Sequence, residues 1–273
     1  MKRTLLFFTM LALIPMGFAA QPNDTVKAKP GIVAHRGFHR FEGSAENSIS
    51  AMRHAVAHDF EGTEFDAQIT ADGVSIIFHD RIMQDYVIPE TPYDILRKQP
   101  AFTLKSGEQV PTLDAMLFAC RQALLEQQPR EKHTKLFFEI KSLAPVALRQ
   151  HLIGQIIETI GKYQLHDDIF FISFDLEICM TMAKMMPDIP VAYLGSTIPP
   201  AELHAKGVFN LDYHWEYLLN HPEWVKEAHD LGMTVNAWTV NDLETAQKML
   251  NLGVDYITTD EPLKMRDWLG IEP

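Results

Sequence analysis

The feature that most constrains this chain is a regular alternation of two kinds of segment from residue 31 onward. Short runs rich in β-branched and aromatic residues, which are typical of buried strands, alternate with stretches whose apolar residues recur at helical spacing. The predicted strands span 31–35, 62–70, 135–141, 168–173, 190–194, 208–212, 234–238 and 254–258. The predicted helices span 45–58, 112–127, 144–163, 175–186, 199–206, 222–231, 241–252 and 261–269.

These eight strand–helix units predict an α/β fold in which the strands close into a (β/α)8 TIM barrel. The chain has 273 residues, and such a barrel commonly takes about 250, so 31–273 is expected to form one barrel domain. An open, doubly wound sheet is the alternative, because periodicity does not show whether a sheet closes. Two helix starts carry capping residues: Thr112 follows Pro111 as an N-cap, and Asn241 and Glu244 have the spacing of a capping box.

One segment departs from this alternation after the second predicted strand. Between Glu64 and His79 the chain has two alternating runs on either side of an Asp-Gly turn sequence, which is typical of a β-hairpin. Because hairpin strands are antiparallel, the second run cannot be a further barrel strand, and we expect it to return His79 to the barrel rim. There His79 is predicted to lie opposite Glu64 or Asp66, on the same side of the hairpin. Residues 80–111 have no strong period and are expected to form a small insertion above this rim.

The N-terminal segment is not expected to belong to the barrel. Residues 1–20 begin with Lys2 and Arg3, continue with a mostly apolar run and end in small residues, which is typical of a cleavable secretory signal peptide. The apolar run is shorter than the ~20 residues needed to span a bilayer, so no stable membrane insertion is expected after cleavage; an uncleaved anchor is the alternative. Residues 21–30 are polar and are expected to form a leader. The protein is therefore predicted to be secreted or periplasmic.

The net charge argues against nucleic-acid binding, and the positions of the cysteines argue against a disulfide. The chain carries 24 Lys and Arg against 36 Asp and Glu, a formal net charge of −12. Nucleic-acid-binding proteins need a basic surface that neutralises phosphates, so no nucleic-acid partner is expected. Cys120 and Cys179 fall on separate predicted helices that would not be neighbours around a barrel, so we expect two buried free thiols rather than a disulfide. The sequence does not predict an oligomeric state.

Chemically reactive side chains gather at the ends of the predicted strands. In a barrel of this kind the active site lies at the C-terminal ends of the strands. The residues at or just after those ends are His35, Arg36, Glu64, Asp66, His79, Asp80, Glu139, Lys141, Trp238 and Asp260. So many charged groups on one rim would be costly for folding unless a ligand binds there.

Three of these residues form a candidate metal site. Glu64, Asp66 and Glu139 come from two neighbouring strands, and three carboxylates held close together would repel one another without a cation. Carboxylate oxygens are hard ligands that favour Ca²⁺ or Mg²⁺ over Zn²⁺, so one divalent cation, Ca²⁺ or Mg²⁺, is the predicted cofactor. The alternative is that the acids only form ion pairs with Arg36 or Lys141.

Two histidines and two cations complete the predicted chemistry. His35 and His79 suit a relay in which one neutral imidazole accepts a proton while the other, charged, donates one, since the ordinary His pKa is about 6.5. Arg36 and Lys141 are groups that bind phosphate oxygens, so an anionic small-molecule substrate is expected. A metal, two imidazoles and two cations fit cleavage of a phosphodiester better than hydrolysis of a glycoside, which uses two carboxyls and needs no metal.

The order of these residues along the chain resembles a known family. The matching segments are His35-Arg36-Gly37, Glu46-Asn47, Glu64-Phe65-Asp66, Asp72-Gly73, His79-Asp80, Pro111-Thr112-Leu113, Phe138-Glu139-Ile140-Lys141, Trp238-Thr239-Val240-Asn241 and Thr259-Asp260. This pattern resembles the glycerophosphodiester phosphodiesterase family of the phospholipase-C-like superfamily, over nearly all of 31–262. The resemblance implies a TIM barrel with a small insertion, here 80–111. The loop 38–45 is longer than in the usual form of the family.

The resemblance also implies an activity and a role for each site residue. The activity is metal-dependent hydrolysis of glycerophosphodiesters to glycerol 3-phosphate and an alcohol, with water or the glycerol 2-hydroxyl as the nucleophile. The roles it implies are catalytic for His35 and His79, metal-binding for Glu64, Asp66 and Glu139, and substrate-binding for Arg36, Lys141 and Trp238.

Two other functions would use the same residues. A lysophospholipase D or phospholipase-C-like enzyme would share the catalytic rim and have a more apolar mouth, for which Tyr213, Trp215 and Tyr217 are candidates. A non-catalytic glycerophosphodiester-binding protein is the alternative from a different class, although such a protein has no need of two histidines.

Overall fold

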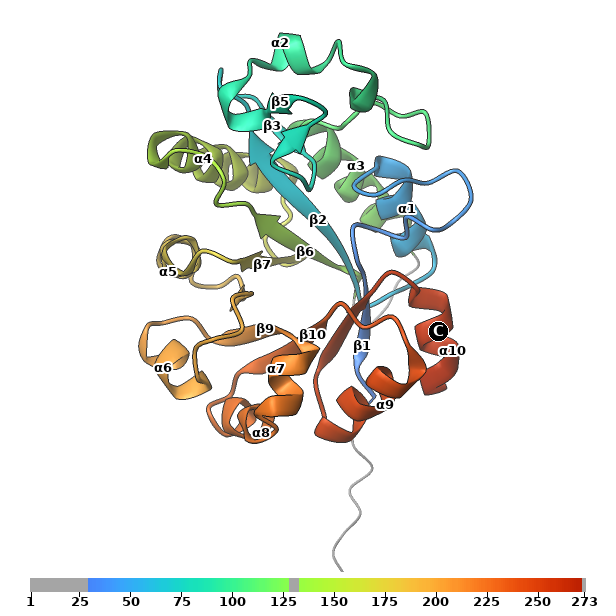
Figure 1. Cartoon of the computed structure of the whole chain (residues 1–273), viewed down its shortest axis with the longest axis vertical. Helices are drawn as coiled ribbons and strands as arrows, with labels where there is room; N and C mark the ends of the chain where they lie inside the picture. The colour runs from blue at the N-terminus through green and yellow to red at the C-terminus, as the bar shows by residue number, and fades with distance from the viewer. Residues whose placement is uncertain (1–28, 128–132, 272–273) are drawn as a thin grey trace, which may run out of the picture.

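Eight parallel strands close into a barrel in the computed structural model, which describes residues 29–127 and 133–271 (Figure 1). The strands are β1 (Gly31–Ala34), β2 (Gly62–Ile69), β6 (Lys135–Ile140), β7 (Ile169–Ser173), β8 (Val191–Tyr193), β9 (Asn210–His214), β10 (Thr234–Trp238) and β11 (Tyr256–Thr259). The sheet closes because β1 pairs in parallel with two strands, so that Ala34 lies opposite Thr259 of β11 and Thr63 of β2. This closure confirms the predicted TIM barrel and excludes the open sheet.

Helices surround the strands on the outside of the barrel, as Figure 1 shows. They are α1 (Ile49–Ala57), α3 (Leu113–Glu126), α4 (Val146–Tyr163), α5 (Leu176–Met185), α6 (Pro200–Ala205), α7 (Trp215–Asn220), α8 (Glu223–Asp230), α9 (Leu243–Leu252) and α10 (Pro262–Leu269). Helix α7 was not predicted; it has 6 residues and begins directly after the last residue of β9, with no turn sequence to separate the two elements.

Side-chain caps set where several helices begin. Ser48 accepts a hydrogen bond from the first turn of α1, so this helix starts later than predicted. Thr112 caps α3 as predicted. The N-cap of α9 is Asp242, whose carboxylate accepts from the backbone amide of Thr245 at 2.9 Å, so the capping box predicted at Asn241 is wrong.

Apolar side chains fill the interior of the barrel below the rim. Val33, Phe137, Phe170 and Leu194 pack together there, and the rings of Phe137 and Phe170 stack with their centroids 4.7 Å apart. Gly62 makes room for them, because a Cβ at this position would lie 2.6 Å from the Phe137 ring. A larger apolar layer lies between the strands and the surrounding helices. Because side chains fill the interior, it leaves no channel between the strands, and the C-terminal rim is where barrels of this kind bind their substrates.

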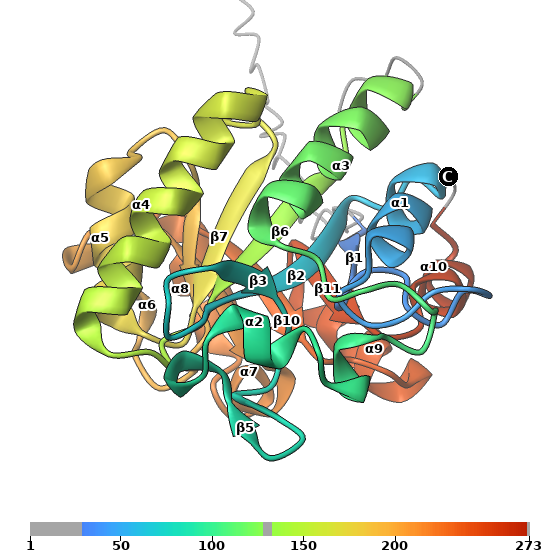
Figure 2. The ribbon, with the colours of Figure 1, turned by 90° about the horizontal axis from the view of Figure 1, so that it is seen from above.

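The hairpin and the insertion extend the sheet beyond the barrel. Strand β3 (Ser75–Ile77) folds back antiparallel on β2, with Ile77 opposite Ala67, which confirms the predicted hairpin. The insertion contains β4 (Ile82–Met83), β5 (Tyr86–Val87), α2 (Tyr93–Leu96) and short 3₁₀ turns at Ile88–Glu90 and Pro100–Phe102. It has a small apolar core of its own, formed by Ile76, Met83, Ile88, Leu96, Phe102 and Val110. In Figures 1 and 2, β3, α2 and β5 lie together at one end of the molecule.

The remaining expectations concern the cysteines and the N-terminus. Cys120 in α3 and Cys179 in α5 are buried free thiols, as predicted. No helix within 29–127 and 133–271 is long and apolar enough to cross a bilayer. The predicted signal peptide, 1–20, and most of the leader that follows it lie outside the described residues.

Candidate active site

The C-terminal ends of the barrel strands surround a cavity of about 120 Å³, which we call the inner pocket. Its lining residues are His35, Arg36, Glu64, His79, Glu139, Ile172, Phe174, Leu194, Asp212, Trp238, Thr239 and Thr258. Six of the eight predicted site residues are among them. The other two, Asp66 and Lys141, contact each other beside the pocket, and Lys141 also contacts Glu139. The fold therefore brings all the predicted site residues together.

Three buried acids form a cluster at one side of the inner pocket. Carboxylate oxygens of Glu64, Asp66 and Glu139 lie within 4.8 Å of one another. Burial, together with the charges of Asp66 and Glu139, raises the pKa of Glu64 well above its ordinary value. Burial and the charge of Asp66 raise the pKa of Glu139 to about 8. The three acids therefore repel one another when all are ionised.

Lys141 partly compensates the acidic cluster. Its Nζ lies 2.8 Å from Oδ1 of Asp66 and 2.7 Å from Oε1 of Glu139. Burial alone would lower the pKa of Lys141, but the two carboxylates raise it above its ordinary value. Burial acts to raise the pKa of Asp66, but the charge of Lys141 acts in the opposite direction, and on balance the pKa of Asp66 is lowered. Lys141 thus forms the ion pairs that were the alternative to a phosphate contact, and its contact with substrate stays a prediction.

Asn47 fixes the orientation of Asp66. Its side-chain amide donates to Oδ2 of Asp66 at 2.7 Å, and its carbonyl oxygen accepts from the backbone amide of Asp66 at 3.0 Å. Asn47 is buried and has a positive φ of 60°, a conformation that Asn adopts more readily than most residues. The two hydrogen bonds turn the other oxygen of Asp66 toward Lys141.

The cluster has the properties of a site for a hard divalent cation. Oε2 of Glu64 accepts from the backbone amide of Arg36 at 2.7 Å, but its Oε1 is buried without a hydrogen-bond partner. An unpaired, buried carboxylate oxygen is costly, and a cation bound to it would remove that cost. Three carboxylates are the donor set that Ca²⁺ and Mg²⁺ prefer. The residues present therefore fit the predicted metal site.

His35 is held by a carboxylate from the other end of the chain. Its Nδ1 lies 2.7 Å from Oδ1 of Asp260, which also accepts from Nε2 of His39 at 3.3 Å. Asn241 donates to the second oxygen of Asp260 at 2.7 Å. Although burial raises it, the pKa of Asp260 is held low by the hydrogen bonds from His35 and His39. Because an ionised carboxylate only accepts, Nδ1 of His35 carries the hydrogen and Nε2 is left for proton exchange.

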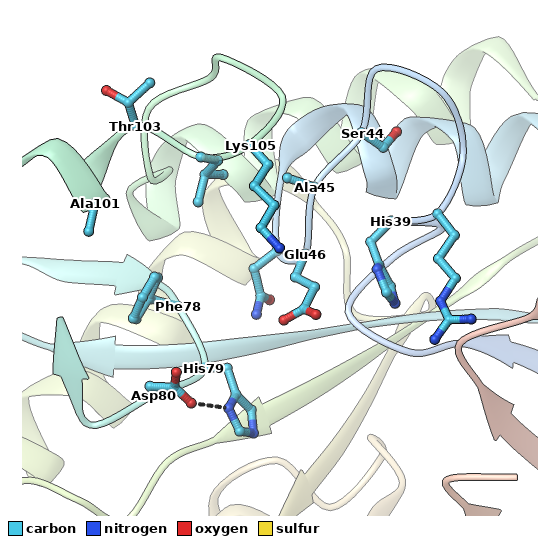
Figure 3. Close-up of a pocket in the computed structure, with 13 residues that line it drawn as sticks. His39, Ser44, Ala45, Glu46, Phe78, His79, Asp80, Ala101, Thr103 and Lys105 are labelled. Carbon is cyan, nitrogen blue, oxygen red and sulfur yellow. Dashed lines mark hydrogen bonds and ion pairs between the residues drawn. The ribbon is translucent and has the colours of Figure 1, made fainter. Parts of the chain in front are cut away.

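His79 has the same arrangement with a different partner. Its Nδ1 lies 2.7 Å from Oδ1 of Asp80 (Figure 3), so its Nε2 is likewise left for proton exchange. Burial lowers the pKa of His79, and the charges of Lys141 and Arg36 act in the same direction, whereas Asp66 and Asp80 oppose them. His79 is therefore neutral over a wider pH range than an exposed histidine.

The route by which His79 reaches the site differs from the predicted one. Since Ile77 lies opposite Ala67, a continued β3 would place His79 opposite Phe65, on the other face from Glu64 and Asp66. The chain leaves the sheet instead, because the Gln68 amide donates to the backbone carbonyls on both sides of His79, at 2.6 and 2.7 Å. This turn, rather than strand register, directs the imidazole into the inner pocket.

Arg36 stands at the sharp turn after β1. It has a φ of 52°, and the following Gly37 has a φ of 79°. The Arg36 guanidinium pairs with Glu46 at 2.7 Å, while its Nε is buried without a partner among the described residues. Burial acts to lower the pKa of Arg36, but the hydrogen bond to Glu46 and the nearby carboxylates raise it above its ordinary value. A permanently charged group with an unused donor suits the binding of an anion.

An apolar wall faces these charged groups. Trp238 donates from Nε1 to the backbone carbonyl of Asp212 at 2.8 Å, and its ring meets that of Phe174 edge-on with centroids 5.5 Å apart. Two aromatics suggested for an apolar mouth lie elsewhere, because Tyr213 is fully buried in the core and Trp215 packs against it. Of the three candidates, only Tyr217 is exposed.

A wider cavity of about 590 Å³ lies beside the inner pocket, and we call it the outer cleft. The loop after β1 lines one side with His39, Arg40 and residues 44–47, and the insertion lines the other with Ala101, Thr103, Leu104 and Lys105. Figure 3 shows Lys105 extending into this cleft toward Glu46. His79 lines both cavities, so the two adjoin at this residue. The long loop 38–45 therefore shapes the outer cleft rather than the inner pocket.

Four residues of the site were given no catalytic or binding role from the sequence: Asn47, Asp212, Asn241 and Asp260. Asp260 was noted at a strand end, but its contact with His35 depends on barrel closure. Asn47 and Asn241 occur in the segments that resemble the family, and this resemblance was the sequence signal that could have indicated them as site residues. Asp212 lies within a predicted strand, where the alternation alone gave no reason to separate it from its neighbours.

Comparison with known proteins agrees with this geometry. The glycerophosphoryl diester phosphodiesterase family matches residues 35–264. The crystal structure of a glycerophosphodiester phosphodiesterase from Parabacteroides distasonis has a TM-score of 0.82 and 34% identity, covering 89% of this chain and 98% of its own. A phosphodiesterase from Oleispira antarctica in complex with the product sn-glycerol-3-phosphate has a TM-score of 0.74 and 23% identity, covering 89% and 97%.

A curated relative extends the comparison. A glycerophosphodiester phosphodiesterase from Caldanaerobacter subterraneus subsp. tengcongensis is 26% identical over 242 residues, which are 85% of this chain and 94% of the relative. The family match spans nearly the whole barrel and confirms the resemblance found in the sequence. The chain belongs to the glycerophosphoryl diester phosphodiesterase family and is a phosphoric diester hydrolase.

Proposed function

We propose that this enzyme hydrolyses glycerophosphodiesters to glycerol 3-phosphate and an alcohol, with one divalent cation and two histidines acting on the phosphate. The observation that carries the proposal is the inner pocket, where two imidazoles backed by carboxylates and a cluster of three buried acids border one cavity. The names of the relatives, and the bound sn-glycerol-3-phosphate of the Oleispira antarctica enzyme, support this substrate class.

The two cavities suggest how the substrate lies. A glycerophosphodiester has one constant half, the glycerol, and one half that varies with the alcohol. The small inner pocket suits the constant half, and the wider outer cleft suits the variable one. The phosphate then lies where the cavities meet, close to His79 and Arg36. The lysolipid-cleaving alternative gains no support here, because Tyr213 and Trp215 do not form an apolar mouth.

The charged groups then bind the phosphate. Glu64, Asp66 and Glu139 would hold a Ca²⁺ or Mg²⁺ ion, which supplies positive charge that stabilises the phosphate as negative charge develops on it. Arg36 adds a permanent positive charge and exchanges its Glu46 partner for a phosphate oxygen. Lys141 neutralises part of the acidic cluster and so reduces its repulsion of the incoming anion.

The histidines move the protons. His35, which borders the inner pocket, accepts a proton at Nε2 from the nucleophile, either water or the glycerol 2-hydroxyl. His79, which borders both cavities, acts in its protonated form, which the charge of Asp66 and the hydrogen bond with Asp80 favour; its Nε2 donates a proton to the oxygen of the departing alcohol as the bond of that oxygen to phosphorus breaks. Asp260 and Asp80 keep the rings in the required tautomer and orientation. A protein that only binds the diester would not need the two histidine–carboxylate pairs, His35 with Asp260 and His79 with Asp80.

A substrate panel tests this function. Glycerophosphocholine, glycerophosphoethanolamine and lysophosphatidylcholine are incubated with the enzyme in Ca²⁺, in Mg²⁺ and in excess chelator, and glycerol 3-phosphate is measured. We expect rapid release from the first two substrates with metal and loss of activity with chelator. Full activity in chelator contradicts the metal site, and preference for the lysolipid contradicts the substrate class. Tight binding of glycerophosphocholine without turnover would identify a binding protein instead.

We also propose that the protein is exported and that residues 1–20 are removed. The support is the sequence pattern of a basic start, an apolar run and small residues. N-terminal sequencing of the protein isolated from an exporting bacterial host is expected to find Ala20 or Gln21 first. A chain that retains Met1 in the membrane fraction would contradict cleavage.

A further inference from the structure

We propose that Asp212 binds a free hydroxyl of the glycerol moiety at the floor of the inner pocket, so that the enzyme selects diesters whose glycerol is not acylated. This inference rests on the proposed function and adds the residue that recognises the substrate's constant half. Asp212 lies on β9, lines the inner pocket and is 1% exposed. It is the one lining carboxylate, among the described residues, that belongs neither to the acidic cluster nor to a histidine pair.

Asp212 has an unused hydrogen-bond acceptor. Asn236 donates to its Oδ1 at 2.9 Å, and no other donor reaches the carboxylate among the described residues. The same Asn236 amide group donates to Thr258 at 2.8 Å, while its own Oδ1 is buried without a partner. Two acceptor oxygens at this buried position therefore lack donors. A buried acceptor without a hydrogen bond destabilises the folded state unless a ligand supplies a donor, and hydroxyl groups are suitable donors.

The surroundings define the kind of ligand that completes this site. Burial raises the pKa of Asp212 to about 7, so the carboxyl would carry negative charge above neutral pH and would repel a phosphate oxygen. The walls near it, Trp238, Phe174 and Leu194, are apolar. A ligand with hydroxyl donors on a short carbon chain matches both features. Glycerol enters with its phosphate toward Arg36 and a free hydroxyl toward Asp212.

An acyl group would defeat this recognition in two ways. Esterification of the hydroxyl removes the donor and leaves the buried oxygen unpaired. It also adds a chain for which a cavity of about 120 Å³ has little room. A site built to hydrogen-bond a hydroxyl discriminates strongly against analogues that lack it, because its polar groups are then left unsatisfied.

Substitution of Asp212 tests the inference. Asp212→Leu removes both acceptors at similar size, and Asp212→Asn keeps one acceptor for Asn236. Each variant is assayed in metal with glycerophosphocholine and with ethylene glycol phosphocholine. The second substrate has the same leaving alcohol and keeps the hydroxyl that can act as the nucleophile, but it lacks the terminal hydroxyl that we assign to Asp212. We expect Asp212→Leu to lower kcat/KM for glycerophosphocholine by roughly 10- to 100-fold, mainly through KM, and to leave kcat/KM for ethylene glycol phosphocholine nearly unchanged. The loss for Asp212→Asn should be smaller and in the same direction.

The exposed Asp188 provides the matched control, since Asp188→Asn should change neither value. Equal losses on both substrates in both Asp212 variants would assign the residue a purely structural role and overturn the inference. So would equal kcat/KM values of the unaltered enzyme for the two substrates. If Asp212→Leu does not fold, binding of sn-glycerol 3-phosphate to Asp212→Asn decides, and an unchanged Kd overturns the inference. Failure of the unaltered enzyme on glycerophosphocholine would instead overturn the proposed function.

Discussion

Nδ1 of His35 lies 2.7 Å from Oδ1 of Asp260, although 225 positions separate the two residues in the chain. His35 follows β1 and Asp260 follows β11, and these strands are neighbours because the barrel closes between them. Asn241, which follows β10, donates to the other oxygen of Asp260 at 2.7 Å. Three adjacent strands therefore cooperate to orient one imidazole, and closure of the barrel is a condition for building the acid–base pair.

The first prediction concerns this pair. Asp260→Asn removes the negative charge that holds the hydrogen on Nδ1 of His35 and stabilises the protonated ring. We expect kcat for glycerophosphocholine to fall by roughly 10²-fold, within the range that general acid–base catalysis contributes, while metal affinity stays the same. Steady-state kinetics and calorimetric metal titration measure the two quantities. Unchanged kcat would show that Asp260 does not position His35.

The second prediction compares the two histidines. His35→Ala and His79→Ala should each lower kcat by roughly 10²- to 10⁴-fold, because each removes one proton transfer. A substrate with a very acidic leaving group, such as a 4-nitrophenyl phosphodiester, needs little protonation of that group. It should therefore rescue His79→Ala much more than His35→Ala. Rescue of His35→Ala instead would exchange the two roles, and near-full activity of either variant on glycerophosphocholine would remove it from the mechanism.

The sequence contained most of the fold and most of the site. The alternation of strands and helices predicted the barrel, and the position of residues at strand ends predicted the cluster of Glu64, Asp66 and Glu139. The position of His79 was predicted by the wrong argument, because Gln68 pulls the chain out of the sheet before the strand register can apply. Asn241 was taken for a helix cap, whereas it holds Asp260.

These errors share a physical cause. Local patterns describe a residue through its neighbours in sequence, but His79 is positioned by Gln68 and Asn241 by Asp260, which belong to other segments of the chain. Their partners depend on how the strands pair, which no short segment encodes. Buried hydrogen-bond partners of this kind become visible only when the sheet is assembled.

The third prediction concerns the metal. Glu64→Gln removes one charge from the acidic cluster at nearly constant size. Without metal, we expect this variant to have a higher Tm than the unaltered enzyme, since the raised pKa of Glu64 reflects unrelieved burial and repulsion. With saturating Ca²⁺ or Mg²⁺ the order should reverse, because an ion present at about 100 times its Kd stabilises the folded enzyme by ~2.7 kcal/mol. Calorimetric melting with and without chelator measures both. Identical metal-induced shifts in Tm would exclude Glu64 as a ligand.

The fourth prediction is a dependence of stability on pH in the metal-free enzyme. The pKa of Glu139 is about 8 in the folded protein and has an ordinary value of 4.5 when the chain is unfolded. Between these values the folded state keeps a proton that the unfolded state has lost, so the free energy of unfolding falls as pH rises through this window. Above pH 8 this contribution levels off.

Glu139→Gln isolates that contribution. Asp212 also has a raised pKa, so only the difference between the unaltered enzyme and Glu139→Gln reports on Glu139. The difference in free energy of unfolding, measured by urea titration from pH 5 to 9, should grow with pH in favour of the variant. Saturating metal should abolish this trend, since the ion binds the deprotonated carboxylate. A difference independent of pH would contradict the raised pKa.

The fifth prediction separates steric crowding from backbone strain at the turn that carries Arg36. Gly37 and Gly43 both have a φ of 79°, so alanine is strained at either position, by about 1 kcal/mol or more. At Gly37 a Cβ would also lie 2.7 Å from Cβ of Ala51, whereas at Gly43 nothing lies within 4 Å. Gly43→Ala should therefore lower only Tm. Gly37→Ala should lower Tm further and reduce kcat/KM at least tenfold, because relief of the clash displaces His35 and Arg36. Equal Tm values and equal activities for the two variants would show that the turn tolerates the added methyl group.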